Sequence, residues 1–528
     1  MNITFLIFVL ILIVFFANQI NKKKKIAFCF LIYDKIHNEE LWYRFFKNAD
    51  PNKYTIYVHY KVDTPLQYFE QYKLKNPVPT KYGDISLVKA HRLLFREAMK
   101  DKDNYKFINI SNSCFPMKSF DYIYDQLTRD NYGHFIQQSR QMIDHIINQL
   151  YPAIPRDMIN KSSQWFILNR EHAHMCIHQT IIDNYNTMFA PEEVFFITTI
   201  FQHKKENTIK IVPNISNEAT TYTCWPDNKC KYLQSEESEY TGPTHKSPRN
   251  YTKIDPNELY YLNTSKCLFG RKFADNCYGL QNSLFLKKKN LVFSSVGDKT
   301  NFTNDWLSNR DEKNFDVWVV YYGKDREDKY KDKVDYWERR KGSKMQNFHY
   351  IWNKYKSLIL TYERFFILDD DIVFNTKEIN ECFNLSKQYN LWMLQPSFHG
   401  DSKISHEITR RQKGNTLRYS NFVEINTPLI HRDVIEDIME MYCPSLTGWG
   451  IDCMMSHILI NRSGYNKKRI AILDKVSCIN PDEDKKGGGQ REIVLLQPNT
   501  IRQQKWQYFK QKNRITFDID QIQQYGTV

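Results

Sequence analysis

The chain has 528 residues, and its 74 Lys and Arg against 60 Asp and Glu give a formal net charge of +14. Hydrophobic residues make up 41% of the sequence, while only 17 residues are Gly and 18 are Pro, which excludes collagen-like, low-complexity and disordered chains. The 11 cysteines form no CxxC pair, which excludes a zinc ribbon and a dense disulfide framework.

The first predicted element is an apolar run without charge at residues 3–20. A helix of this length spans roughly 27 Å, close to the thickness of the hydrocarbon core of a bilayer. Four lysines follow at 22–25, and no small-residue cleavage site is present. The run therefore predicts an uncleaved, single-pass membrane anchor within residues 1–24. The lysine flank favours a cytosolic position for the rest of the chain.

From Lys25 onward, continuous apolar runs alternate with helical patterns. Strands are predicted at 25–35, 54–63 and 106–111, and helices at 39–46 and 85–101. This alternation is typical of a parallel sheet, whose ligands bind beyond the carboxyl ends of the strands. The polar residues that follow the strands are site candidates: Asp34, His59, Asp63 and residues 111–114.

A further helix is predicted where the sequence reads FAPEEVFFITTIF. Pro191 suits the first turn of this helix, and Glu192 and Glu193 follow in that turn. The simple interpretation is that both acids complement the helix dipole, a frequent arrangement. The alternative is that they serve a site, and spacing alone does not separate the two.

Eight segments between residues 25 and 285 occur in the order found in one enzyme family. They are IAFCFLIYDKIHNEELW, YTIYVHYK, GDISLVKA, INISNSCFPMKSFDYIY, SSQWFILNREHA, FAPEEVFFITTI, TYTCWPD and CLFGRKF. Together they resemble the core-2/I-branching β-1,6-N-acetylglucosaminyltransferases with their plant and peptide-O-xylosyl relatives. The resemblance implies a GT-A-like (Rossmann-like) α/β domain that transfers N-acetylglucosamine or xylose from a UDP-sugar, with inversion and without a metal.

The resemblance also implies roles for individual residues. Glu193 matches the family's catalytic carboxylate, with Glu192 in place of an Asp. A carboxylate suits this chemistry because a base must take the proton of the acceptor hydroxyl as it attacks the sugar. Glu192 and Trp165 are candidates for acceptor contact, although Trp165 is equally compatible with the core. One departure is His91, which stands where the family has an acid near the uridine.

Basic side chains are expected on the leaving diphosphate, whose developing charge must be neutralised. Lys272 matches the family's lysine, and Arg271 lies beside it. Arg249 or Lys253 fits a second basic position upstream. A solvated basic turn is the alternative for Arg271 and Lys272.

The second half, residues 286–481, begins a new set of alternating patterns after three lysines. Strands are predicted at 291–298 and 315–323, and a helix from Met345. The segment FFIL then ends in Asp369, Asp370 and Asp371. In an extended chain Asp369 and Asp371 point to the same side and could hold Mn²⁺ or Mg²⁺ on a nucleotide sugar. A solvated acidic turn or a helix cap is the alternative.

A second motif in this half is GWGID, which places Trp449 and Asp452 at the start of a helix. Asp452 is the candidate acceptor-side base and Trp449 an acceptor contact, whereas a simple glycine turn is the alternative. Together with LDDDI, LQPSFHG and SHEITRR, this motif resembles plant nucleotide-sugar transferases with a similar sheet. No late His offers a third metal ligand; Cys478, Asn480 and Asp482 are the residues available.

These observations predict a membrane-anchored, bifunctional glycosyltransferase with two GT-A-like domains in tandem, at 25–285 and 286–481. Its partners would be a nucleotide-sugar donor, a glycan or glycoprotein acceptor and the membrane. The first domain would need no cofactor. A catalytically inactive glycan-binding or scaffold protein is the alternative. No recognition helix or clustered basic arm supports nucleic-acid binding. The tail, 482–528, is assigned no chemistry.

Overall fold

The computed structural model describes residues 24–136, 144–212, 219–225, 248–298, 300–325, 328–481 and 492–528. The chain divides into two compact units, Met1–Leu286 and Lys287–Val528, next to the boundary expected from the sequence. The predicted membrane anchor at residues 3–20 lies outside the described residues. Across the described ranges, no helix is both long enough and apolar enough to cross a membrane.

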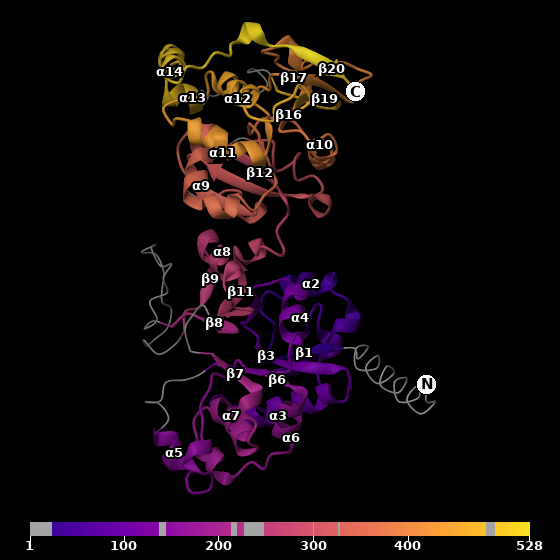
Figure 1. The fold of residues 1–528 in the computed structure, drawn as a ribbon, viewed down its shortest axis with the longest axis vertical. Helices are drawn as coiled ribbons and strands as arrows, with labels where there is room; N and C mark the ends of the chain where they lie inside the picture. Colours follow the sequence, from indigo (N-terminus) through magenta and orange to yellow (C-terminus); the bar gives the residue numbers. More distant parts are fainter. Residues whose placement is uncertain are drawn as a thin grey trace, which may run out of the picture. The chain divides into compact units, whose positions relative to one another are not determined.

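The first unit is built on a six-stranded sheet in the order β2-β1-β3-β6-β5-β7 (Figure 1). Its strands are β1 (Lys25–Ile32), β2 (Tyr54–Tyr60), β3 (Asn104–Ser111), β5 (Gly133–Ile136), β6 (Ile167–Asn169) and β7 (Ile209–Val212). Strands β1, β2 and β3 are parallel, as predicted. Strand β6 runs antiparallel to β3, so the sheet is mixed. This reversal brings the segment before β6 to the carboxyl end of β3.

Helices cover both faces of this sheet, because its central strands are apolar on both sides (Figure 1). In β1, Ile26 and Phe28 face the core that contains helices α2 and α4, whereas Ala27 and Cys29 face the core that contains α3, α6 and α7. The helices of this unit are α2 (Glu39–Lys47), α3 (Ser86–Met99), α4 (Phe120–Thr128), α5 (Asp144–Leu150), α6 (Arg170–His178), α7 (Glu192–Gln202) and α8 (Pro256–Thr264).

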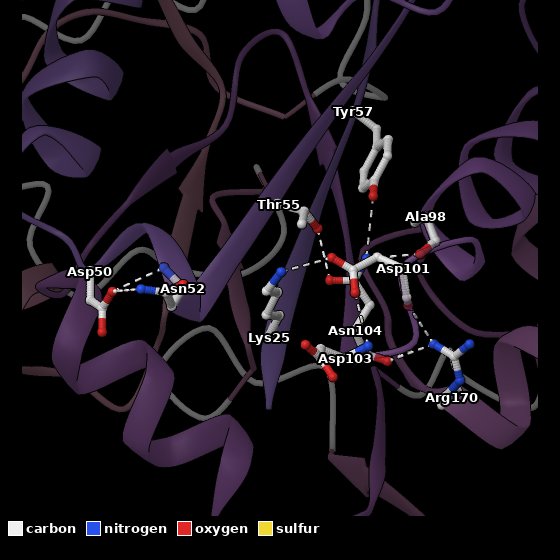
Figure 2. Close-up of polar contacts among 10 residues, drawn as sticks. All are labelled: Lys25, Asp50, Asn52, Thr55, Tyr57, Ala98, Asp101, Asp103, Asn104 and Arg170. Carbon is white, nitrogen blue, oxygen red and sulfur yellow. Dashed lines mark hydrogen bonds and ion pairs between the residues drawn. The ribbon is translucent and has the colours of Figure 1, made fainter. Parts of the chain in front are cut away.

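A polar network ties together the amino ends of β1, β2 and β3 (Figure 2). Asn104, the first residue of β3, accepts a hydrogen bond from Thr55 at 2.8 Å and donates one to the Ala98 carbonyl at 2.8 Å. Lys25 pairs with Asp101 at 2.9 Å, and Arg170 donates to the carbonyl oxygens of Asp101 and Asn104. These groups satisfy one another, so this end of the sheet is structural and the opposite end is left for a ligand.

Two small sheets are built above the carboxyl end of β3. One has the order β4-β10-β8, and the other pairs β11 with β9. Their strands are β4 (Phe115–Pro116), β8 (Thr221–Thr223), β9 (Tyr251–Lys253), β10 (Phe269–Arg271) and β11 (Phe273–Tyr278). Because β4 follows β3 within a few residues and pairs with β10, the end of β10 is fixed near the end of β3.

The second unit has its own mixed sheet, in the order β14-β13-β12-β15-β18-β16-β19-β17-β20. Its strands are β12 (Asn290–Val296), β13 (Phe315–Tyr321), β14 (Tyr336–Arg339), β15 (Arg364–Ile367), β16 (Met393–Phe398), β17 (Leu417–Ser420), β18 (Leu429–His431), β19 (Ile470–Cys478) and β20 (Gln524–Thr527). Strands β12 to β15 are parallel neighbours, as the alternating pattern predicts.

The helices of the second unit are α9 (Lys344–Ile359), α10 (Thr376–Gln388), α11 (Arg432–Met441), α12 (Ile451–Ile460), α13 (Glu492–Leu496) and α14 (Asn499–Lys512). The described part of the tail belongs to this unit, because β20 pairs with β17 and adds a strand to the sheet. Trp506 of α14 is buried, and a Cβ at Gly450 would lie 2.1 Å from its ring. The tail therefore supports the turn that precedes Asp452.

Candidate active site

The first candidate site forms where α7 meets the carboxyl end of β3. The segment 161–165 connects the two, because the Ser162 amide donates to the Glu193 carbonyl at 2.8 Å. At its other end, Asn109 of β3 donates its side-chain amide to the Gln164 carbonyl at 2.6 Å. Helix α7 itself is held by a run of apolar residues that is buried on nearly all sides. The carboxylates at its first turn are thereby fixed beside the sheet.

Glu193 lies in an ion pair at this point, with Lys161 Nζ 3.2 Å from its carboxylate. The Glu193 side chain is 24% exposed, so one part of it is accessible to a ligand. Lys161 was not predicted from the sequence, where a single lysine before SSQWF carries no periodic or motif signal.

Arg271, at the end of β10, is a buried cation of the same site. Burial lowers the pKa of its guanidinium, and the nearby Cys114 and Glu193 side chains oppose this shift. Its guanidinium lies 4.3 Å from the centre of the Trp165 ring, a cation–π contact. Among the described residues its Nε has no hydrogen-bond partner. A buried guanidinium with a free N–H is suited to an anionic ligand.

Trp165 is 6% exposed and belongs to the core of the first unit. Because one face of its ring is covered by Arg271, its placement favours positioning of the guanidinium over stacking on an acceptor sugar. Cys114, within the predicted segment 111–114, also contacts Arg271.

The other predicted cations differ in their surroundings. Burial lowers the pKa of Lys272, and the positive charge of Arg271 lowers it further. Arg249 instead lies 3.5 Å from both carboxylate oxygens of Glu258, and its guanidinium lies 4.5 Å from the centre of the Tyr251 ring. The charge of Arg249 is thus already neutralised within the chain, which leaves Arg271 and Lys272 as the better candidates for an anion.

Glu192 is almost fully enclosed, with 4% of the residue exposed. Its Oε2 atom has no hydrogen-bond partner among the described residues. Burial raises the pKa of the Glu192 carboxyl to about 7, and the neighbouring Glu193 carboxylate adds to the shift. The Glu192 carboxyl group therefore keeps its proton up to near-neutral pH.

Replacement of Glu192 by Gln should change how stability depends on pH. Because its pKa is raised from 4.5 to about 7, the folded chain keeps a proton that the unfolded chain releases, and stability is lost as the pH rises through this window. The free energy of unfolding of Glu192→Gln, relative to that of the wild type, should therefore rise by about 1–3 kcal/mol as the pH increases from 5 to 8. Urea unfolding at both pH values measures this, and parallel pH curves for the two proteins would contradict it.

Two residues predicted near strand ends, His59 and Asp63, contact other groups of the chain, and His91 of α3 lies in the core. The His59 ring accepts a hydrogen bond from the Val78 amide at 2.9 Å, and burial lowers its pKa to about 4. Asp63 pairs with Lys73 at 2.8 Å. His91 is 1% exposed, and burial lowers its pKa to about 3, so it is a neutral core residue.

In the second unit the aspartate triplet follows β15, but it forms a turn. The strand ends at Ile367, and the Ile372 amide donates to the Asp369 carbonyl at 3.3 Å. The alternation of an extended chain therefore does not apply to Asp369 and Asp371. Asp370 is partly buried and accepts a hydrogen bond from the Gly297 amide at 2.9 Å, and desolvation raises its pKa to about 7.

Asp369 already has a cationic partner, since Lys344 Nζ lies 2.8 Å from its Oδ1. Lys344 also donates to the carbonyl oxygens of Ile425 and Asn426 at 2.7 and 3.0 Å. Within the ranges that the structure describes, no group of three or more His, Cys, Asp or Glu is arranged to hold a metal ion. The metal site at Asp369 and Asp371 stays a prediction, and the protein groups alone do not complete it.

Asp452 and Trp449 lie around the start of α12, as predicted. Burial raises the pKa of Asp452 to about 6, whereas Trp449 is 41% exposed. Glu424, which was not predicted from the sequence, is 4% exposed and lies within electrostatic range of Asp452 and Asp369. Burial is the main cause that raises its pKa to about 7. Glu424 thus lies within electrostatic range of both acids and of Lys344.

Comparison with known proteins finds a family model that matches part of the first unit. Residues 26–255 match the family described as "Branch: Core-2/I-Branching enzyme". A curated relative is "Glycosyltransferase BC10" of Oryza sativa subsp. japonica, 26% identical over 160 residues. This alignment covers 29% of the present chain and 40% of the rice protein, so the chain spans less than half the length of that relative.

Among solved structures, S. aureus TarS 1-349 in complex with UDP-GlcNAc is 12% identical, with a TM-score of 0.28, over 39% of this chain and 60% of that chain. S. aureus TarS gives a TM-score of 0.27 at 13% identity, over 38% of this chain and 37% of that chain.

The family match contains the central sheet and Glu193 but ends before Arg271, so the position of Arg271 is an independent observation. It does not extend to the second unit. Residues 26–255 of this chain are thus similar to the core-2/I-branching enzyme family.

Proposed function

We propose that the first unit is a glycosyltransferase that moves a sugar from a nucleotide-sugar donor to a hydroxyl of a glycan or glycoprotein. Glu193 is the base that takes the proton of the acceptor hydroxyl, and Arg271 with Lys272 neutralises the leaving diphosphate. The observation that supports this most strongly is the proximity of Glu193 to Arg271, from segments that are distant in the chain. An accessible carboxylate beside a buried guanidinium suits both halves of the reaction.

The proposed donor is a UDP-sugar, carrying N-acetylglucosamine or xylose, and the proposed stereochemical course is inversion without a metal. Two findings favour this version: the similarity of residues 26–255 to the core-2/I-branching enzymes and the two cations available to the diphosphate. Residues 3–20 are proposed as a membrane anchor from their composition alone.

For the second unit, the proposal is a nucleotide-sugar transferase with Asp452 as the base. Asp369 and Asp371 would hold Mn²⁺ or Mg²⁺, which would supply positive charge to the donor's phosphates. Lys344 forms an ion pair with Asp369 in the structure, so the metal ion must displace Lys344 or bind beside it. The position of Asp369 directly after β15, with Glu424 within electrostatic range of both Asp369 and Asp452, supports a site there.

Donor turnover by the full chain tests both proposals. Release of nucleotide from a panel of UDP- and GDP-sugars is measured with Mn²⁺ and with EDTA, for the wild type, Glu193→Gln and Asp369→Asn. We expect the first unit to release nucleotide from its donor in the presence of EDTA and to lose this activity in Glu193→Gln. We expect the second unit to release nucleotide only with the metal ion and to lose this activity in Asp369→Asn. A Glu193-dependent turnover that EDTA abolishes would overturn the metal-free mechanism, and absence of any turnover would favour an inactive glycan-binding protein.

A further inference from the structure

Two aromatic side chains stand out from the surface of the first unit. Tyr82 is 85% exposed and Phe189 is 71% exposed, the two highest exposures of large hydrophobic residues in the part of the chain that the structure describes. Their ring centres lie 5.8 Å apart at an angle of 69°, an edge-to-face pair. Adjacent exposed aromatic rings form an apolar patch, and such patches often mark binding sites.

The backbone holds this pair in place. The Ala190 amide donates to the Gly83 carbonyl at 3.0 Å, which joins the loop before α3 to the loop before α7. Gly83 has a φ of +68°, and a Cβ there would lie 2.4 Å from the Phe189 ring. The ring therefore packs directly on the glycine backbone, and a larger residue at 83 would displace it.

The pair also borders the candidate site. Phe189 lies one turn before Glu193, whose amide donates to the Ala190 carbonyl at 3.1 Å. Tyr82 lies within electrostatic range of the Arg271 guanidinium. Asp84, two residues after Tyr82, lies within electrostatic range of the Glu192 carboxyl group. Both loops thus approach the carboxylates at the start of α7.

We propose that Tyr82 and Phe189 form a stacking platform for a sugar ring of the acceptor. This inference rests on the proposed function and adds the acceptor subsite to it. A pyranose presents a face of C–H groups that packs on an aromatic ring, while its hydroxyls stay in water or reach polar groups. Glu193 must lie beside the acceptor hydroxyl, so aromatic rings one turn before it suit the acceptor. The nucleobase of the donor is the competing occupant.

Saturation-transfer NMR on the full chain separates these occupants. The probes are the methyl β-glycosides of galactose, glucose, xylose, N-acetylglucosamine and N-acetylgalactosamine, and UDP in a separate sample. We expect at least one glycoside to bind the wild type, with its Kd raised about tenfold or more in Tyr82→Ala and in Phe189→Ala. Tyr82→Phe keeps the ring and should bind normally, and Tyr122→Ala removes a 43% exposed aromatic of α4 as a matched control.

The Kd of UDP should stay within twofold in all these variants. Unchanged glycoside binding in both alanine variants, or no glycoside binding by the wild type, would overturn the platform. A selective loss of UDP affinity would assign the rings to the nucleobase instead. Failure of the proposed function is distinguishable, because it shows as absence of nucleotide-sugar turnover by the unaltered chain, whatever the variants bind.

Discussion

Replacement of Glu193 by Gln should lower sugar transfer by the first unit about 10²–10⁴-fold, the range typical of a lost general base. Glutamine has the same shape but cannot accept the proton of the acceptor hydroxyl. The kcat should carry the loss, while the donor's KM should change little, because Arg271 and Lys272 remain. The measurement is initial-rate transfer with the donor that the wild type turns over.

Glu171 offers a matched control for this experiment. It lies in the first turn of α6, as Glu193 does in α7, and it pairs with Lys205 at 2.8 Å, as Glu193 pairs with Lys161. Glu171→Gln should therefore lose a comparable ion pair and retain transfer. If Glu193→Gln keeps transfer within tenfold of the wild type, Glu193 is a helix-dipole residue, and the base must be sought elsewhere.

The sheets of both units were largely predictable because their strands are short apolar runs between polar turns. Strands β1, β2, β3, β12 and β13 begin and end within about three residues of the predicted ranges. Strand β6, by contrast, is only three residues long, and its antiparallel direction depends on a distant pairing with β3. The contributions of β20 and Trp506 to the second unit are long-range as well, and a Gln-rich tail gives no local sign of them.

The candidate sites were predictable only in part, for a related reason. Motifs point to residues with a family counterpart, such as Glu193, and to the acidic triplet. They do not show which cation balances which acid. Lys344 precedes Asp369 by 25 positions in the sequence and yet pairs with it. Glu258, which neutralises Arg249, and Glu424 likewise came from segments with no motif.

Arg249 is paired with Glu258 within the chain, whereas the Nε atom of Arg271 has no hydrogen-bond partner among the described residues. We therefore expect the second large effect on transfer from a change at Arg271. Arg271→Met should lower kcat/KM for the donor about 10²–10³-fold, the range seen when one electrostatic stabiliser of a developing negative charge is removed. Arg271→Lys should recover only part of this. It keeps a positive charge but loses the planar group that stacks on Trp165 at 4.3 Å.

Arg249→Met is the informative comparison, because it also removes a guanidinium from this unit. Since Glu258 already neutralises Arg249, the donor's kcat/KM should fall only a few-fold. Stability should fall instead, because the Glu258 carboxylate, 5% exposed, would then keep only the hydrogen bond from Tyr251 among the polar contacts described for its carboxylate. Steady-state kinetics and urea unfolding of the two variants separate these effects. A larger kinetic loss in Arg249→Met than in Arg271→Met would mean that Arg249 leaves Glu258 for the diphosphate when the donor binds.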